Sequence, residues 1–472
     1  MWPHEKINYI TIGGFKMGFL EFLKDLLSEP AILMGLVAFV GLVAMKAPGH
    51  KILTGTLGPI LGYLMLAAGA DVISGNLDPL SKMIEKGFHI TGVVPNNEAV
   101  TSVAQKILGV ETMSILIAGL IINLLVARFT RYKYVFLTGH HSFFMACLLS
   151  AVLGAVGFSG TSLILVGGFF LGTWSAISPA IGQKYTLKVT DGDEIAMGHF
   201  GSVGYYLSAF IGSLVGKGSK STEDIHVPEK FGFLRNTTIS TALTMVIFYL
   251  VSAIAAGPDF VSSLSDGKSP YLFAILCGLK FAVGVTVVYS GVRMILADLL
   301  PAFQGIADKV IPNAVPAVDC AVFFPYAQTA VIIGFISSFV GGLIGMFVLG
   351  AFGGVLIIPG LVPHFFCGAT AGVYGNATGG RRGAVVGSFV NGLFLAFLPA
   401  LLLPVLGQLG FSNATFGDFD FGWIGILLGK IGGQFGQVGI YAIIAAVLAV
   451  LIVPSIIKPS KTAINNEGME LD

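Results

Sequence analysis

Three histidines stand at interruptions of strongly apolar stretches, where ionisable side chains are costly and are functional candidates by default. His140 and His141 follow a glycine in LTGHHSFF, and His199 follows a glycine in GHFGSVGYY. Imidazoles at helix breaks can bind a hydroxylated or anionic substrate, although a single histidine at a helix end is often structural. His364, in VPHFFCG, is a weaker candidate of the same kind.

Two carboxylates occupy matching positions, because Glu98 and Asp319 each stand three residues after a proline, Pro95 and Pro316. A carboxylate at such a place can cap a helix by accepting free backbone N–H bonds. It can also accept hydrogen bonds from the hydroxyls of a bound polyol. The sequence leaves both interpretations open for each residue.

Motifs for metal, nucleotide or covalent chemistry are absent from the sequence. There is no HExxH, no CxxC, no carboxylate cluster with metal spacing and no GxxxxGK[ST] loop. The cysteines, four in number, lie in apolar surroundings and are interpreted as buried thiols. We expect no cofactor and no metal, and the net charge of +1 gives no reason to expect a nucleic-acid partner.

The composition requires a membrane protein, since 55% of the residues are hydrophobic and 11% are charged, with a mean hydropathy of +0.87. Residues 320–380 contain no Asp, Glu, Lys or Arg, and about 20 apolar residues suffice for one helix to cross. Only helices or closed barrels satisfy their backbone groups in lipid, and the long apolar runs exclude the alternation of a barrel. The predicted fold is an all-α polytopic membrane protein.

About eleven transmembrane helices are predicted, with one further segment, 196–215, that dips into or lies on the membrane between basic flanks. Cationic loops on one side place the C-terminus in the cytoplasm and the N-terminus outside. The predicted spans are 31–46, 53–75, 107–127, 134–157, 162–183, 237–256, 272–296, 328–350, 353–375, 384–407 and 436–457.

The domain organisation follows from these spans. Residues 15–27 carry charges at helical spacing and are predicted to form an interfacial amphipathic helix, and the polar tail is predicted to be disordered. We expect an N-terminal interfacial segment 1–30, a first membrane repeat 31–215, a cytoplasmic linker 216–236, a second repeat 237–458 and a tail 459–472.

Internal similarity suggests the two repeats. The phrase GHFGSVGYY beginning at Gly198 returns as GQFGQVGIY beginning at Gly433, and Gly139 and Gly360 stand equally far beyond Glu98 and Asp319. Chance similarity among glycine-rich helices is the alternative. An odd number of crossings between the copies would make the repeat inverted, with a polar substrate site near the membrane midplane.

Four long motifs resemble the ascorbate-type membrane subunit, component IIC, of the bacterial phosphoenolpyruvate-dependent sugar phosphotransferase system. They are FLTGHHSFFMAC, VTDGDEIAMGHFG, VPAVDCAVFFPYA and VPHFFCGATAGVYGNATGGRRGA, and the resemblance runs from about residue 30 to 455. It implies a homodimer of eleven-span protomers in the bacterial plasma membrane, each with a dimer-interface domain and a mobile core. It also implies that IIA and IIB subunits in the cytoplasm phosphorylate the sugar acid that the core carries inward by an elevator-like movement.

The resemblance implies substrate-binding roles for His140, His199 and Asp319. Ascorbate-binding relatives have a glutamine shortly after each histidine motif, where this chain has Phe144 and Phe200. The loss of two amides leaves the substrate open among ascorbate, related sugar acids and alditols.

The expected function is therefore transport, with phosphoryl transfer left to the partner subunits. The alternative is a proton-coupled secondary transporter of a small polyhydroxylated anion, in which the same histidines and carboxylates form a proton relay. A membrane enzyme has little support, because no pair of a nucleophile and a base emerges.

Overall fold

A computed structural model describes most of the chain. The described residues are 9–12, 15–18, 29–89, 92, 93, 95, 97–225, 237–265, 267–309, 311–407 and 415–457, and within several helices some further side chains lie outside this description. The predicted tail 459–472 and residues 226–236 of the predicted linker are not among the described residues.

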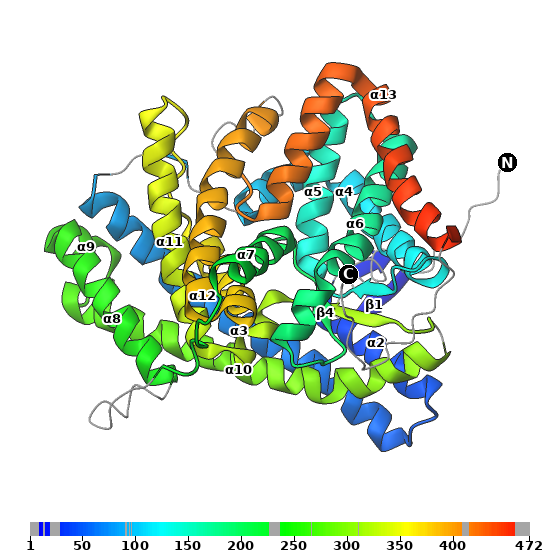
Figure 1. Cartoon of the computed structure of the whole chain (residues 1–472), viewed down its shortest axis with the longest axis horizontal. Coiled ribbons are helices and arrows are strands. Elements are labelled where there is room, and N and C mark those ends of the chain that lie inside the picture. Colours follow the sequence, from blue (N-terminus) through cyan, green and yellow to red (C-terminus); the bar gives the residue numbers. More distant parts are fainter. Residues whose placement is uncertain are drawn as a thin grey trace.

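Long helices dominate the described part of the chain (Figure 1). They are α2 (Pro30–Ala44), α3 (Gly49–Gly87), α4 (Asn97–Phe129), α5 (Gly139–Ala155), α6 (Gly160–Val189), α7 (Ser202–Val215), α8 (Thr237–Ala256), α9 (Pro258–Leu264), α10 (Pro270–Lys309), α11 (Gln328–Ala351), α12 (Leu361–Gly407) and α13 (Phe419–Ile457).

Among the described residues, six helices are long and apolar enough to cross a membrane, or seven if α8 and α9, bent by 117°, form one span. The predicted dipping segment contains α7, which is one of the shorter apolar helices. A multi-pass helical membrane protein is confirmed at this level. The number of eleven spans stays a prediction.

Two of the longest helices are broken in the middle by a glycine in the left-handed region, where other residues are strained. Gly380 breaks α12 at φ 55°, and Gly436 breaks α13 at φ 59°. Each broken helix therefore has two arms. The first arm of α13 lies where the sequence predicted a loop, because Asp418 and Asp420 interrupt the apolar run there.

The repeated phrase occupies two different settings. Residues 198–206 lead from a short strand into α7, whereas residues 433–441 cross the break in α13. The second copy is open to the surroundings, since Phe435 is 60% exposed and Val438 is 76% exposed.

A small buried parallel sheet lies within the mostly helical fold and corrects the start of the predicted span 134–157. Its order is β3 (Tyr134–Phe136), β5 (Val315–Val318) and β4 (Ala196–Met197), with Phe136 opposite Ala317 and Met197 opposite Val318. The strands are only two to four residues long. Hydropathy assigned β3 to a predicted helix because short buried strands in a parallel sheet are as apolar as a helix.

The N-terminal segment corrects a second prediction. Residues 15–18 form strand β2 (Phe15–Gly18), which pairs antiparallel with β1 (Tyr9–Ile12). The predicted amphipathic helix over 15–27 is therefore wrong in its first residues, and residues 19–27 lie outside the described part. Alternation of side chains along this segment suits a hairpin as well as a helix face.

The helices pack in three groups. Helices α2, α3, α8 and α10 pack on one another, and α10 and α3 lie along the lower part of the view in Figure 1. Helices α4, α5 and α6 form a second group with α13, while α7 and α11 pack on α12. Glycines allow α11 and α12 to approach closely. A Cβ on Gly372 of α12 would lie 2.4 Å from the carbonyl oxygen of Ala330 in α11, so only glycine fits there.

Candidate functional site

The parallel sheet brings the predicted site residues together. Asp319 follows β5 directly, His199 comes shortly after β4, and His140 comes shortly after β3, at the start of α5. The carboxyl ends of parallel strands share one edge, so three distant sequence segments deliver their polar side chains to one place. Hydrogen bonds continue past the strands, from the Gly198 N–H to the Val318 carbonyl oxygen at 2.7 Å.

Glycine is required where β4 meets β5. A Cβ on Gly198 would lie 2.3 Å from the carbonyl oxygen of Ala317, so any side chain would push the two strands apart. His199 therefore reaches the edge of the sheet only because its predecessor has no side chain.

A chain of hydrogen bonds orients His140. Its Nδ1 atom lies 3.0 Å from the Tyr63 hydroxyl of α3, and its Nε2 atom lies 3.4 Å from Oδ2 of Asp319. A neutral imidazole meets both partners when Tyr63 donates to Nδ1 and Nε2–H points at the carboxylate. Asp319 is 4% exposed, and its other oxygen accepts the Ala321 N–H at 3.1 Å, which caps a short 3-10 helix, η2 (Cys320–Tyr326).

The protonation of His199 follows from its neighbours. Its Nδ1 atom accepts the Gly201 N–H at 3.1 Å and lies 2.8 Å from the Tyr205 hydroxyl. Because Nδ1 is an acceptor, the proton of the neutral ring is on Nε2. His199 is thereby a hydrogen-bond donor, and the Tyr205 hydroxyl holds the ring in place.

His141 lies between the other two histidines in a buried position. Its ring centroid is 3.6 Å from that of His199 and 4.7 Å from that of His140. Phe421 stacks on it at 5.7 Å. Its Nδ1 atom is 3.9 Å from Oδ2 of Asp418, which stands directly before α13.

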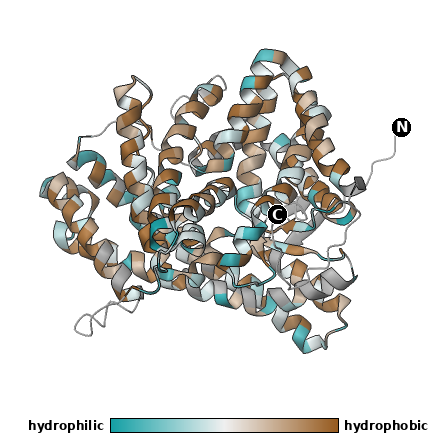
Figure 2. Ribbon diagram, viewed as in Figure 1, coloured by the Kyte–Doolittle hydropathy of each residue, from teal (hydrophilic) through white to brown (hydrophobic). Residues whose placement is uncertain are grey.

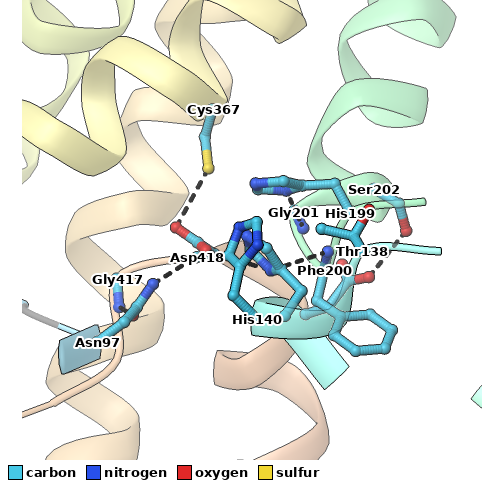
Figure 3. A network of polar contacts seen from close by, with 12 residues as sticks. Asn97, Thr138, His140, His199, Phe200, Gly201, Ser202, Cys367, Gly417 and Asp418 are labelled. Carbon is cyan, nitrogen blue, oxygen red and sulfur yellow. Dashed lines mark hydrogen bonds and ion pairs between the residues drawn. The ribbon is translucent and has the colours of Figure 1, made fainter. Parts of the chain in front are cut away.

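Asp418 belongs to a second polar group beside the histidines (Figure 3). Its Oδ2 atom accepts a hydrogen bond from the Asn97 amide at 3.1 Å, and its Oδ1 atom accepts one from Cys367 Sγ at 3.3 Å. Asn97 in turn accepts the Gly417 N–H at 2.9 Å. These bonds tie the starts of α4 and α13 to the first arm of α12 near its beginning.

Asp420 positions the helix that follows His199. It is fully buried and accepts hydrogen bonds from the Ser202 hydroxyl at 2.8 Å, the Val203 N–H at 3.1 Å and Trp174 Nε1 at 3.2 Å. A carboxylate at the N-terminus of α7 satisfies free N–H groups there. Asp420 thus fixes the helix start directly after the His199 turn.

The two phenylalanines at the glutamine positions differ in placement. Phe144 lies at the rim, with its ring centroid 5.9 Å from those of both His140 and His141. Phe200 is fully buried, stacks on Phe136 of β3 at 4.6 Å and lies edge-on to His141 with ring centroids 6.2 Å apart. Its backbone N–H donates to Nδ1 of His141 at 3.4 Å. Phe200 thus contributes a backbone hydrogen bond to the cluster, and its ring contributes packing.

Two candidates are not part of the cluster that the structure describes. His364 is buried, but its Nδ1 atom lies 2.8 Å from the Ser338 hydroxyl and its ring packs on Phe339, both in α11. Glu98 lies in the first turn of α4, and its side chain is outside the described part, so its role stays a prediction.

Two groups of side chains approach the spacing of metal ligands among the described residues. They are His141 with His199 and Asp418, and His199 with Asp319 and Cys320, each with ligand atoms within 4.8 Å. The proton on Nε2 of His199 suits donation to a substrate oxygen better than ligation, since a metal ligand nitrogen must be deprotonated. The arrangement therefore offers donors and carboxylate acceptors for a polar organic molecule.

Sequence reasoning missed Tyr63, Asn97, Asp418 and Asp420. Tyr63 lies within a long apolar helix and has no neighbouring polar signal. Asp418 had a usable signal, because Gly417-Asp418-Phe419 has the same form as Gly198-His199-Phe200.

Long apolar helices around a buried cluster of histidines and carboxylates are typical of membrane carriers. The family model of the phosphotransferase system (PTS) sugar-specific permease component matches residues 25–420. The chain belongs to this family, and the resemblance found in the sequence is confirmed.

A curated relative points in the same direction. The ascorbate-specific PTS system EIIC component of Mycoplasma pneumoniae is 26% identical over 429 residues, a similarity that covers 77% of this chain and 63% of that protein. The chain thus spans less than two thirds of the length of this relative.

Proposed function

We propose that this chain is the membrane-spanning IIC subunit of a sugar phosphotransferase system and that it carries ascorbate, a related sugar acid or an alditol. Its family consists of permease components, which move the sugar while other components phosphorylate it. The observation that carries the proposal is the convergence of His140, His199 and Asp319 at one edge of the sheet.

The cluster suits a polyhydroxylated ligand. Nε2–H of His199 donates, and the Asp319 carboxylate accepts from hydroxyl groups. His140 is the accessible member, with 37% of its side chain exposed, and we place the ligand beside it. Phe144 adds an apolar rim where ascorbate-binding relatives have an amide, so the preferred ligand has fewer polar groups on that side.

We further propose that the two halves are inverted repeats that form a mobile core. Strand β5, which precedes Asp319, pairs with β3, which precedes Gly139. Val93, close before Glu98, pairs in parallel with Ile357, close before Gly360. This exchange of strands between equivalent positions supports the repeat better than the repeated phrase does, and it is compatible with a site between the halves.

Several further features belong to the same proposal. The core moves in an elevator-like manner against α2, α3, α8 and α10, which form the interface of a homodimer. An IIB subunit, charged by IIA, phosphorylates the sugar at the cytoplasmic face of the bacterial plasma membrane. The basic loops place the C-terminus in the cytoplasm and the N-terminus outside.

A proton-coupled carrier is the second candidate, and one observation favours it. Tyr63, His140 and Asp319 form a continuous chain of titratable groups, as a proton relay requires. A proton-coupled carrier needs a proton gradient and no phosphate donor, whereas a phosphotransferase subunit needs a phosphate donor and no proton gradient.

Transport assays distinguish the two candidates. Thermal-shift screening of the purified protein against ascorbate, sugar acids, pentitols and hexitols identifies the ligand, because a molecule that binds only the folded state raises its melting temperature. The radiolabelled ligand is then followed into vesicles with or without the IIA and IIB subunits and a phosphate donor. Uptake that requires these subunits and ignores an uncoupler supports the proposal. Uptake that an uncoupler abolishes, and that does not need the subunits, refutes it in favour of the proton-coupled carrier.

A further inference from the structure

An apolar cavity that is partly open to the surroundings lies apart from the polar cluster, between α5, α6 and the two arms of α13. Its volume is about 260 Å³, and its walls include Leu149, Phe170, Trp174, Trp423, Ile443 and Val450. Figure 2 shows the second arm of α13 as largely hydrophobic. Apolar walls of this kind favour apolar guests.

The cavity is elongated along the helices that line it. It extends from Phe170 to Ile177 along α6 and from Ile443 to Val450 along the second arm of α13. Seven residues of helix rise span about 10 Å. This length and the apolar walls fit an extended hydrocarbon chain better than a compact molecule.

One end of the cavity meets a basic turn, residues 128–133. Its Tyr132 hydroxyl donates to the carbonyl oxygen of Val450 at 3.1 Å, and its ring packs in a cluster with Ile177 and Val447. Lys133 adjoins Tyr132 and donates to the carbonyl oxygen of Arg128 at 3.1 Å.

The basic turn is strongly cationic. Arg128 and Arg131 are exposed, and the sequence has no Asp or Glu between Glu111 and Asp191. Lys133 is half-buried, and burial, followed by the charge of Arg128, lowers the pKa of its ammonium group. An anionic group at this turn would relieve the repulsion among the three cations.

A buried donor lies at the same end. Trp423 packs edge-on against Trp174 with ring centroids 4.9 Å apart. Nε1 of Trp174 donates a hydrogen bond to Asp420, whereas Nε1 of Trp423 has no hydrogen-bond partner among the described residues. The Trp423 ring lines the cavity close to the cationic surface, as tryptophan does at the headgroup level of a membrane, so a charged headgroup at the basic turn would have hydrocarbon directly below it.

We propose that the cavity binds one acyl chain of an anionic phospholipid, with the headgroup on the basic turn. The bound lipid fills the space between the arms of α13. It also packs against Trp174, whose hydrogen bond to Asp420 holds the helix start after His199. The lipid therefore braces the element that carries the polar cluster.

Tryptophan fluorescence gives a direct test, because two of the three tryptophans, Trp174 and Trp423, line the cavity. A Trp2→Phe variant leaves only these two as emitters. The variant is placed in nanodiscs of phosphatidylcholine or phosphatidylglycerol, each with ordinary or brominated acyl chains, since bromine quenches tryptophan on contact. In one mixture the phosphatidylglycerol is brominated and the phosphatidylcholine is ordinary, and in the other the phosphatidylcholine is brominated and the phosphatidylglycerol is ordinary. We expect brominated phosphatidylglycerol to reach the same quenching at about tenfold lower lipid fraction than brominated phosphatidylcholine, because each cation near the surface attracts an anionic lipid.

Two variants in this background separate the parts of the site. Ala446→Phe fills the cavity and should remove most quenching, whereas Val438→Phe, at a 76% exposed position of the same arm, should leave it unchanged. The double variant Arg128→Gln with Arg131→Gln should abolish the preference for phosphatidylglycerol. Arg293→Gln, an exposed arginine of α10, is its control. Size-exclusion profiles and melting temperatures establish that each variant is folded.

Three outcomes would overturn the proposal. Equal quenching by both lipids, unaffected by Ala446→Phe, means contact with bulk lipid alone. Absence of quenching by either lipid means that protein, such as a second copy of the chain, closes the cavity. An intact lipid preference in the double arginine variant, with slower phosphoryl transfer from IIB, means that the basic turn is a protein-docking surface.

Discussion

Replacement of Tyr63 by Phe tests whether the hydrogen-bonded chain prepares the site for its ligand. The hydroxyl lies 3.0 Å from Nδ1 of His140, and the same imidazole lies 3.4 Å from the Asp319 carboxylate. Without the hydroxyl, Nδ1 has lost its donor, and the tautomer that points Nε2–H at Asp319 is no longer enforced. Tyr63 does not need to touch the ligand for this effect.

The size of the effect can be estimated from hydrogen bonds between membrane helices, which are worth about 0.6–1.7 kcal/mol. If the bound state uses the oriented imidazole and the free state does not, the dissociation constant rises by roughly 3- to 18-fold. Isothermal titration of the purified protein with the ligand found by the thermal-shift screen measures this change directly.

Tyr249→Phe is the matched control. Tyr249 of α8 donates to the carbonyl oxygen of Asn76 in α3 and is buried, but its hydroxyl contacts no member of the cluster. Both variants should lower the melting temperature, and only Tyr63→Phe should weaken binding. An unchanged dissociation constant for Tyr63→Phe, with a loss of stability like that of the control, would refute the positioning role.

Three further predictions concern the cluster and its scaffold. Asp319→Asn keeps a side chain that can cap η2 but removes the charge, so ligand affinity should fall by roughly 10- to 150-fold in the same titration; wild-type affinity would leave Asp319 as a helix cap only. Phe144→Gln restores the amide found in ascorbate-binding relatives and should shift preference in a competition assay toward the ligand with more hydroxyls; an unaltered ranking would mean that the rim does not select. Gly372→Ala places a Cβ 2.4 Å from the carbonyl oxygen of Ala330 and should cost about 1–3 kcal/mol of stability, whereas Gly433→Ala, with nothing within 4 Å, should be tolerated in the same thermal unfolding experiment.

Local sequence patterns identified several polar side chains that the structure brings together. His140 and His199 follow glycines at the ends of apolar runs, and Asp319 follows a proline-containing segment, so each was recognisable as a polar residue at a chain break. The structure brings these three together, with His141 between the two other histidines. For Asp319 it also bears out the capping interpretation, since the side chain accepts the Ala321 N–H.

Other partners could not be predicted because their role depends on neighbours far along the chain. Tyr63 is one hydroxyl in a helix of 39 residues, and its partner lies 77 positions away. Asp418 and Asp420 lowered the hydropathy of their segment, so they suggested a loop although Asp420 is fully buried.

The sequence by itself determined the environment of this protein and the identity of its polar groups. A chain with 55% hydrophobic residues and uncharged runs as long as residues 320–380 must bury its backbone hydrogen bonds in helices within lipid. Its motifs also placed it in a permease family. These properties are local or compositional, so they need no knowledge of which segments meet.

Only the tertiary structure decided how the groups combine. The three-stranded sheet joins segments separated by more than a hundred residues, and strands of two to four residues leave no periodic signal in an apolar sequence. The breaks at Gly380 and Gly436 likewise depend on backbone angles that glycine permits but does not require. Pairing between distant strands and the direction of each helix after a break are fixed by packing of the whole chain, and that packing places His140, His199 and Asp319 in one cluster.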